Sequence, residues 1–318
     1  MELLQKQRDF FATQQTKDLP FRKKVLKELQ KVIITREDEI AAAIYKDYKK
    51  PKFESLALET QFVLAELKHV KNNLDLWARP ERKSTTPINW PSSDWIYKEP
   101  YGTVLIIAPW NYPFQLVFAP LIGAIAAGNT AVIKPSEYAP NTSKIISEIV
   151  ASVFSPEYVG VVEGGVEESQ KLLAQRWDYI FFTGSNRVGK IVYGSAAKHL
   201  TPVTLELGGK NPCIVDETAS IALAAKRIVW GKFLNAGQTC LASDYILVHK
   251  SVKEKLINAL KKSITKSYGE NMELSPDLAR MVNPGHYKKL KAMLDGEEII
   301  FGGGFNDKDN YLSLSLIH

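Results

Sequence analysis

Cys240 is the residue of this 318-residue chain best suited to nucleophilic chemistry. It ends a short polar segment, residues 235–240, in which Gly237 and Gln238 indicate a loop and therefore an accessible thiol. An unperturbed cysteine is only slightly ionised at neutral pH, so the thiol needs a nearby base or a positive potential. The other cysteine, Cys213, stands in an apolar segment and is expected to be buried and inert.

A cysteine–histidine hydrolase is one class of enzyme that such a thiol permits. The histidines of the chain are His69, His199, His249, His286 and His318. None of them has sequence neighbours that indicate a catalytic base, so this class remains a weakly supported alternative.

Two polar side chains follow predicted strands. Glu206 lies at the end of an apolar strand, directly before Gly208 and Gly209, and Asn111 follows another strand. The ends of parallel strands are where α/β proteins place their chemistry. A carboxyl group there is either half of a buried ion pair or a general base whose pKa is raised by burial. The amide of Asn111 can donate a hydrogen bond to an oxyanion.

A glycine-containing turn, residues 184–190, lies between a predicted strand and a predicted helix. Its G-x₄-G-K pattern is that of a P-loop, but Ile191 supplies no hydroxyl for Mg²⁺, which disfavours an NTPase. The amides of the helix N-terminus still favour an anion such as a pyrophosphate. A purely structural βα turn is the alternative. The G-x-G-x-x-G fingerprint of dinucleotide-binding sites is absent from the sequence.

The elements that must position these residues follow an α/β pattern. Residues 1–82 are predicted to form amphipathic helices, and residues 84–101 an extended segment with a hairpin turn at 92–94. From residue 102, short apolar strands alternate with helices, which is typical of a parallel sheet covered on both faces. The predicted strands are 104–107, 130–133, 159–162, 179–182 and 203–205, and the predicted helices are 114–127, 141–154, 167–174 and 187–198.

The same alternation restarts after Gly208 and Gly209. A second α/β unit is predicted there, with an extended segment at 214–215, a helix at 220–234, a strand at 245–248, a basic helix at 252–267 and a turn at 302–304. We therefore predict two domains, 1–207 and 208–318.

Composition excludes several classes of protein. The net charge is +6, and the positive excess between residues 250 and 291 has helical spacing, which favours a solvated helix face over a nucleic-acid or membrane surface site. The uncharged stretch 101–133 is interrupted by prolines and is predicted as strand, loop, helix and strand, not as a membrane span. Two cysteines and no secretion signal predict a cytoplasmic protein without a disulfide framework or a metal site.

Five short segments in this order resemble the aldehyde dehydrogenase superfamily, over nearly the whole chain. The short N-terminus and the first segment resemble the class 3 branch, which acts on fatty and aromatic aldehydes. The segments are Pro109-Trp110-Asn111-Tyr112-Pro113, Lys134-Pro135-Ser136-Glu137, Phe182-Thr183-Gly184-Ser185, Leu205-Glu206-Leu207-Gly208-Gly209-Lys210 and Gly237-Gln238-Thr239-Cys240. The resemblance implies a Rossmann-like nucleotide domain with N-terminal helices and a second, catalytic α/β domain.

The resemblance also implies a reaction, the oxidation of an aldehyde to a carboxylic acid with NAD or NADP. Cys240 would attack the carbonyl carbon, and Asn111 and the backbone N–H of Cys240 would hold the oxyanion. Glu206 would activate the water that hydrolyses the resulting thioester. The neighbouring rings of Trp110, Tyr112 and Phe114 suggest a hydrophobic aldehyde, although such rings equally suit a core.

The resemblance also implies which residues contact the cofactor. Lys134 and Glu137 would contact the adenosine ribose, and Gly184, Ser185 and Gly189 would lie at the phosphates. The remaining implied cofactor residues are Pro109, Trp110, Ser136, Thr183, Leu207 and Gly208. No metal, nucleic acid or membrane span is implied.

The chain departs from the family pattern near its end. A later Glu-Ile-Phe-Gly-Pro segment of the family is absent, and residues 311–318 differ from the family pattern. We therefore expect a truncated catalytic domain, and a non-catalytic nucleotide-binding relative is the alternative function. The family is expected to form homodimers. In the family, a C-terminal strand pairs with the arm that we predict at 84–101. Truncation would leave the edge of this arm unpaired and therefore open to association.

Overall fold

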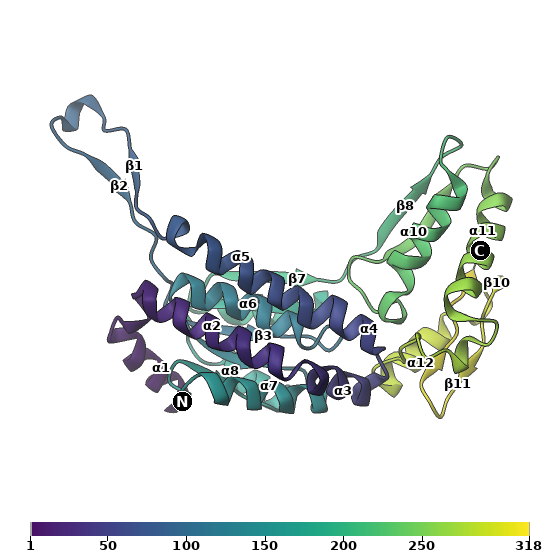
Figure 1. Ribbon diagram of the computed structural model, residues 1–318, viewed down its shortest axis with the longest axis horizontal. Helices are drawn as coiled ribbons and strands as arrows, with labels where there is room; N and C mark the ends of the chain where they lie inside the picture. Colours follow the sequence, from purple (N-terminus) through teal and green to yellow (C-terminus); the bar gives the residue numbers. More distant parts are fainter. Residues whose placement is uncertain (1, 318) are drawn as a thin grey trace. The chain divides into compact units, whose positions relative to one another are not determined.

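The computed structural model describes residues 2–317 and divides into two compact units. The first unit comprises Met1–Glu37, Leu58–Glu137 and Ser143–Glu206, and the second comprises Asp38–Ala57, Tyr138–Thr142 and Leu207–His318 (Figure 1). The chain passes from the first unit to the second for the last time between Glu206 and Leu207. In addition, two segments from the predicted first domain pack with the second unit.

The first unit begins with amphipathic helices, as their apolar periodicity predicts. Helix α2 buries Leu26, Leu29 and Ile33 on one face, and its N-terminus is capped by Asp18, whose carboxylate accepts the Phe21 N–H at 2.9 Å. The elements of this part are α1 (Glu2–Ala12), η1 (Gln15–Lys17), α2 (Leu19–Thr35), η2 (Leu56–Thr60) and α5 (Gln61–Trp77).

A five-stranded sheet of order β5-β4-β3-β6-β7 forms the centre of the first unit. Strand β3 pairs in parallel with both β4 and β6, and β4 pairs in parallel with β5. The strands are β3 (Thr103–Ile107), β4 (Thr130–Lys134), β5 (Val159–Val161), β6 (Tyr179–Gly184) and β7 (Val203–Leu207); the helices are α6 (Gln115–Ala127), α7 (Pro140–Val153), α8 (Val166–Leu173) and α9 (Asn186–Ala197). Every strand and helix predicted for this region is confirmed, with ends that differ by at most two residues.

Burial on both faces explains why these strands appear as continuous apolar runs. All five residues of β3 and all five of β4 are buried. Side chains of β3, β4 and β6 pack with side chains of α1, α8 and α9 in one apolar cluster. The cluster contains Leu4, Leu105, Ile107, Val132, Leu172, Trp177, Ile180, Phe182 and Val192. The uncharged stretch 101–133 is therefore strand, loop, buried helix and strand, as predicted.

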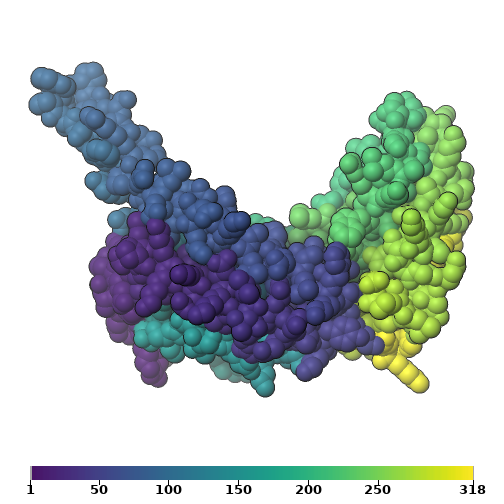
Figure 2. Space-filling view, in the orientation of Figure 1, coloured from purple at the N-terminus to yellow at the C-terminus, as the bar shows by residue number. Residues whose placement is uncertain are grey.

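A two-stranded hairpin projects from the first unit after α5 (Figures 1 and 2). Strand β1 (Glu81–Lys83) pairs antiparallel with β2 (Asp94–Ile96), and η3 (Pro87–Asn89) lies between them. The predicted tight turn at residues 92–94 is wrong, because Asp94 belongs to β2 and residues 84–93 form the connection. Prolines at 87 and 91 lack the N–H that a longer strand ladder needs.

The second unit has its own apolar core around a parallel pair of strands. Strand β8 (Asn211–Val215) pairs with β9 (Ser243–Val248), and α10 (Ile221–Phe233) and α11 (Lys253–Tyr268) contribute most of the buried side chains. Tyr311 and Leu314, near the end of the chain, belong to this core. The other elements are α3 (Glu37–Tyr48), α4 (Lys52–Ser55), η4 (Leu234–Gly237), η5 (Met272–Leu274), α12 (Pro284–Ala292), β10 (Ile299–Phe301), β11 (Phe305–Asn306), β12 (Tyr311–Leu312) and β13 (Leu316–Ile317).

The lysine-rich helix α11 is amphipathic, as its sequence spacing predicts. Leu256, Leu260, Ile264 and Tyr268 recur every four residues and are buried. The intervening lysines are exposed or half-buried on the opposite side. The lysines are therefore spaced as expected for a helix that packs on one face and leaves the other face to solvent.

Candidate active site

The carboxyl ends of the strands in the first unit bring most of the predicted site residues to one edge of the sheet. In the strand register, Ile107 at the end of β3 is opposite Lys134 of β4 and Phe182 of β6. The loops that follow these strands therefore begin side by side. Strand β3 is also the point where the order of the sheet reverses, since β4 and β5 lie on one side and β6 and β7 on the other. In open α/β sheets, ligands bind at this switch point.

The loop that carries Asn111 is fixed at both ends. At its start, the N–H of Ala108 donates to the carbonyl oxygen of Lys134 at 3.0 Å. At its end, the N–H groups of Phe114 and Gln115 donate to one carboxylate oxygen of Glu59 at 2.8 and 3.1 Å. Glu59 is 0% exposed and thus caps the N-terminus of α6 from within the core. Pro109, Trp110 and Asn111 are half-buried between these two anchors.

The aromatic residues after Asn111 belong to the core, not to an open substrate surface. Phe114 is 0% exposed and packs on Phe118 with ring centroids 4.5 Å apart, and Tyr112 is also buried. The interpretation of these two rings as core residues is therefore confirmed. The half-buried Trp110 is the remaining ring of this group.

Replacing Glu59 by alanine is expected to lower the free energy of unfolding by about 2 kcal/mol, because the substitution leaves one buried and one partly buried N–H group without this acceptor. Urea unfolding followed by circular dichroism measures this change. Glu28→Ala, on the exposed face of α2, is the matched control and should change stability by less than about 0.5 kcal/mol. Equal effects of the two substitutions would show that Glu59 is not an important cap.

Lys134 and Glu137 form an ion pair beyond the end of β4. The Lys134 Nζ lies 2.6 Å from Glu137 Oε2, and the lysine side chain is only 3% exposed against 33% for the glutamate. Ser136 between them is buried, and its carbonyl oxygen accepts the Ser143 hydroxyl at 2.9 Å. These contacts fix the turn, and the partly exposed carboxylate of Glu137 lies just beyond the end of β4.

The turn between β6 and α9 has the features of an anion and nucleotide site. Ser185 caps the helix by accepting the Val188 N–H at 3.3 Å, and the Gly189 N–H donates to the Ser185 carbonyl oxygen at 2.8 Å. A Cβ at Gly184 would lie 2.5 Å from the ring of Phe182, so any other residue would require this buried ring to shift. The hydroxyl oxygen of Thr183 is buried and has no hydrogen-bond partner among the described residues. A dinucleotide with a ribose and a pyrophosphate fits this donor set.

Glu206 lies at the same edge, but its expected burial is wrong. The side chain is exposed, as are Leu207 and Gly208 after it. The reason lies in the sheet order, because β7 is an outer strand with a neighbour on one side only. Glu206 is therefore a solvent-exposed carboxylate and not a carboxyl group in an apolar pocket.

Cys240 lies in the second unit, on a turn between η4 and β9, and its side chain is exposed as predicted. The Nδ2 of Asn211 in β8 donates to the carbonyl oxygens of Cys240 and Ala242, at 2.8 and 3.1 Å. The backbone of the cysteine is thus tied to the neighbouring strand. Cys213 is half-buried against the core of this unit, which is less burial than expected for it.

Gln238 holds the segment before Cys240 in place. It is buried, its Nε2 donates to the carbonyl oxygens of Asn235 and Arg280 at 3.0 Å each, and its Oε1 accepts the Val282 N–H at 3.1 Å. From the sequence, Gln238 indicated only a polar loop. Its role as an internal brace depends on residues that lie about forty positions away in the chain.

The predicted catalytic residues thus fall into both units, with Asn111 and Glu206 in the first and Cys240 in the second. The predicted nucleotide residues before residue 207 all lie in the first unit. Among residues 2–317, no group of three or more His, Cys, Asp or Glu side chains is placed to hold a metal ion. Within the same range, no helix has the length and apolar character needed to cross a membrane.

Known proteins are similar to this chain over most of its length. The aldehyde dehydrogenase family model matches residues 3–313. A 4,4'-diaponeurosporen-aldehyde dehydrogenase of Staphylococcus aureus is 52% identical over 97% of this chain and 68% of its own length. The rat aldehyde dehydrogenase family 3 member A2 is 42% identical over 99% of this chain and 65% of its own length. The chain therefore spans about two thirds of the length of these relatives.

Solved structures agree with the sequence matches. The substrate-bound state of Staphylococcus aureus AldH superposes with a TM-score of 0.97 at 50% identity, over 99% of this chain and 69% of the other. Other matched members of the family include one from Canis lupus familiaris named as NADP-preferring and one from Staphylococcus aureus solved with NAD+. The chain belongs to the aldehyde dehydrogenase family and is similar to its family 3 members.

Proposed function

We propose that this chain carries the reactive residues of an NAD(P)-dependent aldehyde dehydrogenase, which converts an aldehyde to a carboxylic acid. The observation that supports this most directly is the exposed thiol of Cys240 on a turn that Asn211 and Gln238 fix from two sides. A nucleophile must be accessible and must also be held in one geometry to attack a carbonyl carbon efficiently.

In the first step, the Cys240 thiolate forms a bond from Sγ to the carbonyl carbon, and the carbonyl π electrons move to oxygen. The product is a thiohemiacetal anion. The side-chain amide of Asn111 and the backbone N–H of Cys240 donate to this oxyanion.

In the second step, the carbonyl group re-forms as a hydride leaves the former aldehyde carbon, and a thioester on Cys240 remains. A bound nicotinamide dinucleotide supplies the acceptor for that hydride. The Lys134–Glu137 pair would hold its ribose, and the turn with Thr183, Gly184 and Ser185 would hold its phosphates. Both NAD and NADP are accepted in this proposal, as both occur among the matched relatives.

In the third step, Glu206 takes a proton from a water molecule, and the water oxygen attacks the thioester carbon. The C–S bond then breaks, the carboxylic acid leaves, and Cys240 returns as a thiolate. A carboxylate that is exposed to solvent can fulfil this role, because water must reach it in every cycle. We propose a hydrophobic aldehyde as the substrate, which the half-buried Trp110 beside Asn111 supports.

The homodimer expected from the family remains a prediction. Its arm corresponds to the hairpin of β1 and β2, a two-stranded sheet that carries exposed Ile88, Trp90 and Trp95.

The test of the proposed function is NADH formation by the purified 318-residue chain with a medium-chain aldehyde and NAD. We expect NADH and carboxylic acid to appear in equal amounts, and neither product without NAD. Calorimetry with NAD alone runs in parallel. NAD binding without NADH formation would reject the enzyme and support a nucleotide-binding relative that does not turn over.

A further inference from the structure

Glu54 connects the N-terminal part of the chain to the turn that carries Cys240. It lies in α4, is 5% exposed, and its Oε2 accepts the backbone N–H of Asn235 at 2.7 Å. The two residues are 181 positions apart, and both belong to the second unit. This contact is one of several that join the segment Asp38–Ala57 to the rest of that unit, together with the hydrogen bond from the Arg280 N–H to the Tyr48 carbonyl oxygen.

The turn that receives this hydrogen bond has an unfavourable backbone. Asn235 and Ala236 have φ angles of 56° and 52°, and Gly237 follows with 78°. Consecutive residues other than glycine in the left-handed region are rare, and they persist only where their surroundings enforce them. Asn235 is 0% exposed, and the carboxylate of Glu54 accepts its backbone N–H in a buried hydrogen bond, so losing this acceptor is costly. Cys240 follows this turn within a few residues.

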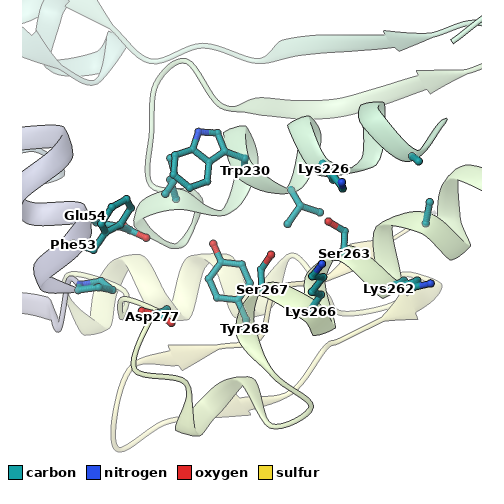
Figure 3. Close-up of a pocket in the computed structure, with 15 residues that line it drawn as sticks. Phe53, Glu54, Lys226, Trp230, Lys262, Ser263, Lys266, Ser267, Tyr268 and Asp277 are labelled. Carbon is teal, nitrogen blue, oxygen red and sulfur yellow. The ribbon is translucent and has the colours of Figure 1, made fainter. Parts of the chain in front are cut away.

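Glu54 also faces a pocket of about 690 Å³ between α4, α10 and α11 (Figure 3). Desolvation is the main cause that raises the pKa of Glu54 to about 7, and the Asn235 N–H and Lys50 oppose this shift. Burial in the same pocket, with Glu54 and Asp277 nearby, raises the pKa of Tyr268. The charged and titratable groups near Glu54 or along this pocket are Lys50, Lys226, Lys262, Lys266, Tyr268 and Asp277.

We propose that Glu54 is a positioning residue for the aldehyde dehydrogenase reaction, because its carboxylate holds the Asn235–Gly237 turn in the conformation that places Cys240. This inference rests on the proposed function for its catalytic consequence, although the turn itself can be tested without turnover. Glu54 does not touch the reacting atoms in this proposal. It acts through the backbone of Asn235.

Because Glu54 can ionise, its hold on the turn is expected to depend on pH. A charged acceptor makes a stronger hydrogen bond than a neutral one, so the turn is held best above about pH 7. The effect on stability has the opposite sign. Because the folded-state pKa is raised from 4.5, Glu54 favours the folded chain at low pH, and this contribution is lost as the pH rises through about 7.

The experiment compares Glu54→Ala and Glu54→Gln with the parent chain at pH 8, by hydrogen exchange of a peptide covering residues 234–240 and by steady-state kinetics. We expect the alanine variant to exchange about tenfold faster in this peptide. Its kcat should fall by about 10- to 100-fold, with the KM for NAD unchanged. The glutamine variant keeps an acceptor, so its hydrogen exchange and its kcat should both return most of the way to the parent values. Because glutamine does not ionise, this variant should lack the rise in kcat near pH 7. It should be no less stable than the parent at pH 8. Asp277→Asn is the matched control, since it removes a carboxylate of the same pocket that does not bind the turn.

The outcomes separate the two proposals. Unchanged exchange in Glu54→Ala would overturn the inference, because the turn would then hold itself. Faster exchange with unchanged kcat would also overturn it, because the contact would then be structural only. Absence of turnover in the parent chain would overturn the proposed function, whereas the exchange measurement would still decide whether Glu54 holds the turn.

Discussion

Replacing Cys240 by alanine is expected to lower aldehyde-dependent NADH formation by on the order of 10⁴-fold or more, because Cys240 supplies the sulfur of the proposed covalent intermediate. Nucleotide binding should be unchanged, since the predicted ribose and phosphate contacts lie in the first unit and Cys240 lies in the second. Stability should change little, because the removed thiol is exposed. The variant therefore separates chemistry from folding and from cofactor binding.

Cys213→Ala is the matched control for this prediction. It removes the only other cysteine of the sequence, which is half-buried against the core of the same unit. NADH formation, NAD affinity by calorimetry and thermal unfolding are measured for both variants. If Cys240→Ala retained substantial turnover, or if Cys213→Ala lost it, the assignment of the nucleophile would be wrong.

The elements of the first unit could be predicted from the sequence because most of its central strands are buried on both faces. Such strands show as short uncharged runs between helices, as Thr103–Ile107 and Thr130–Lys134 do. The edge of the sheet that bears the site follows from the same pattern. Residues that come directly after parallel strands must share one edge, which is where the structure places Asn111, Lys134 and Thr183.

Properties that depend on distant residues could not be predicted in this way. The apolar character of β7 suggested burial of Glu206, but its exposure depends on the position of β7 at the edge of the sheet. Glu54 and Glu59 are ordinary polar residues in the helical pattern. Their roles depend on backbone N–H groups of Asn235 and Phe114, which are 181 and 55 positions away. A buried acid therefore gives no local signal unless its partner is known.

Replacing Glu206 by glutamine is expected to leave the first turnover intact and to stop the following ones. The proposed base acts only on the thioester, so hydride release should still produce about one equivalent of NADH for each chain. The later steady-state rate should fall by about 10²- to 10⁴-fold, because glutamine has nearly the same size but cannot accept a proton from water. Since Glu206 is exposed, the substitution should leave the fold unchanged.

Rapid mixing measures the burst of NADH, and intact-protein mass spectrometry detects the acyl group that remains on Cys240. Added hydroxylamine should restore turnover, since it attacks the thioester without help from a general base. Glu167→Gln, an exposed glutamate in the first turn of α8, is the matched control and should behave like the parent chain. Loss of the burst together with the steady state would place Glu206 before thioester formation. An unchanged steady state would instead mean that another group activates the water, and in that case the exposed position of Glu206 at the edge of the sheet would have no part in hydrolysis.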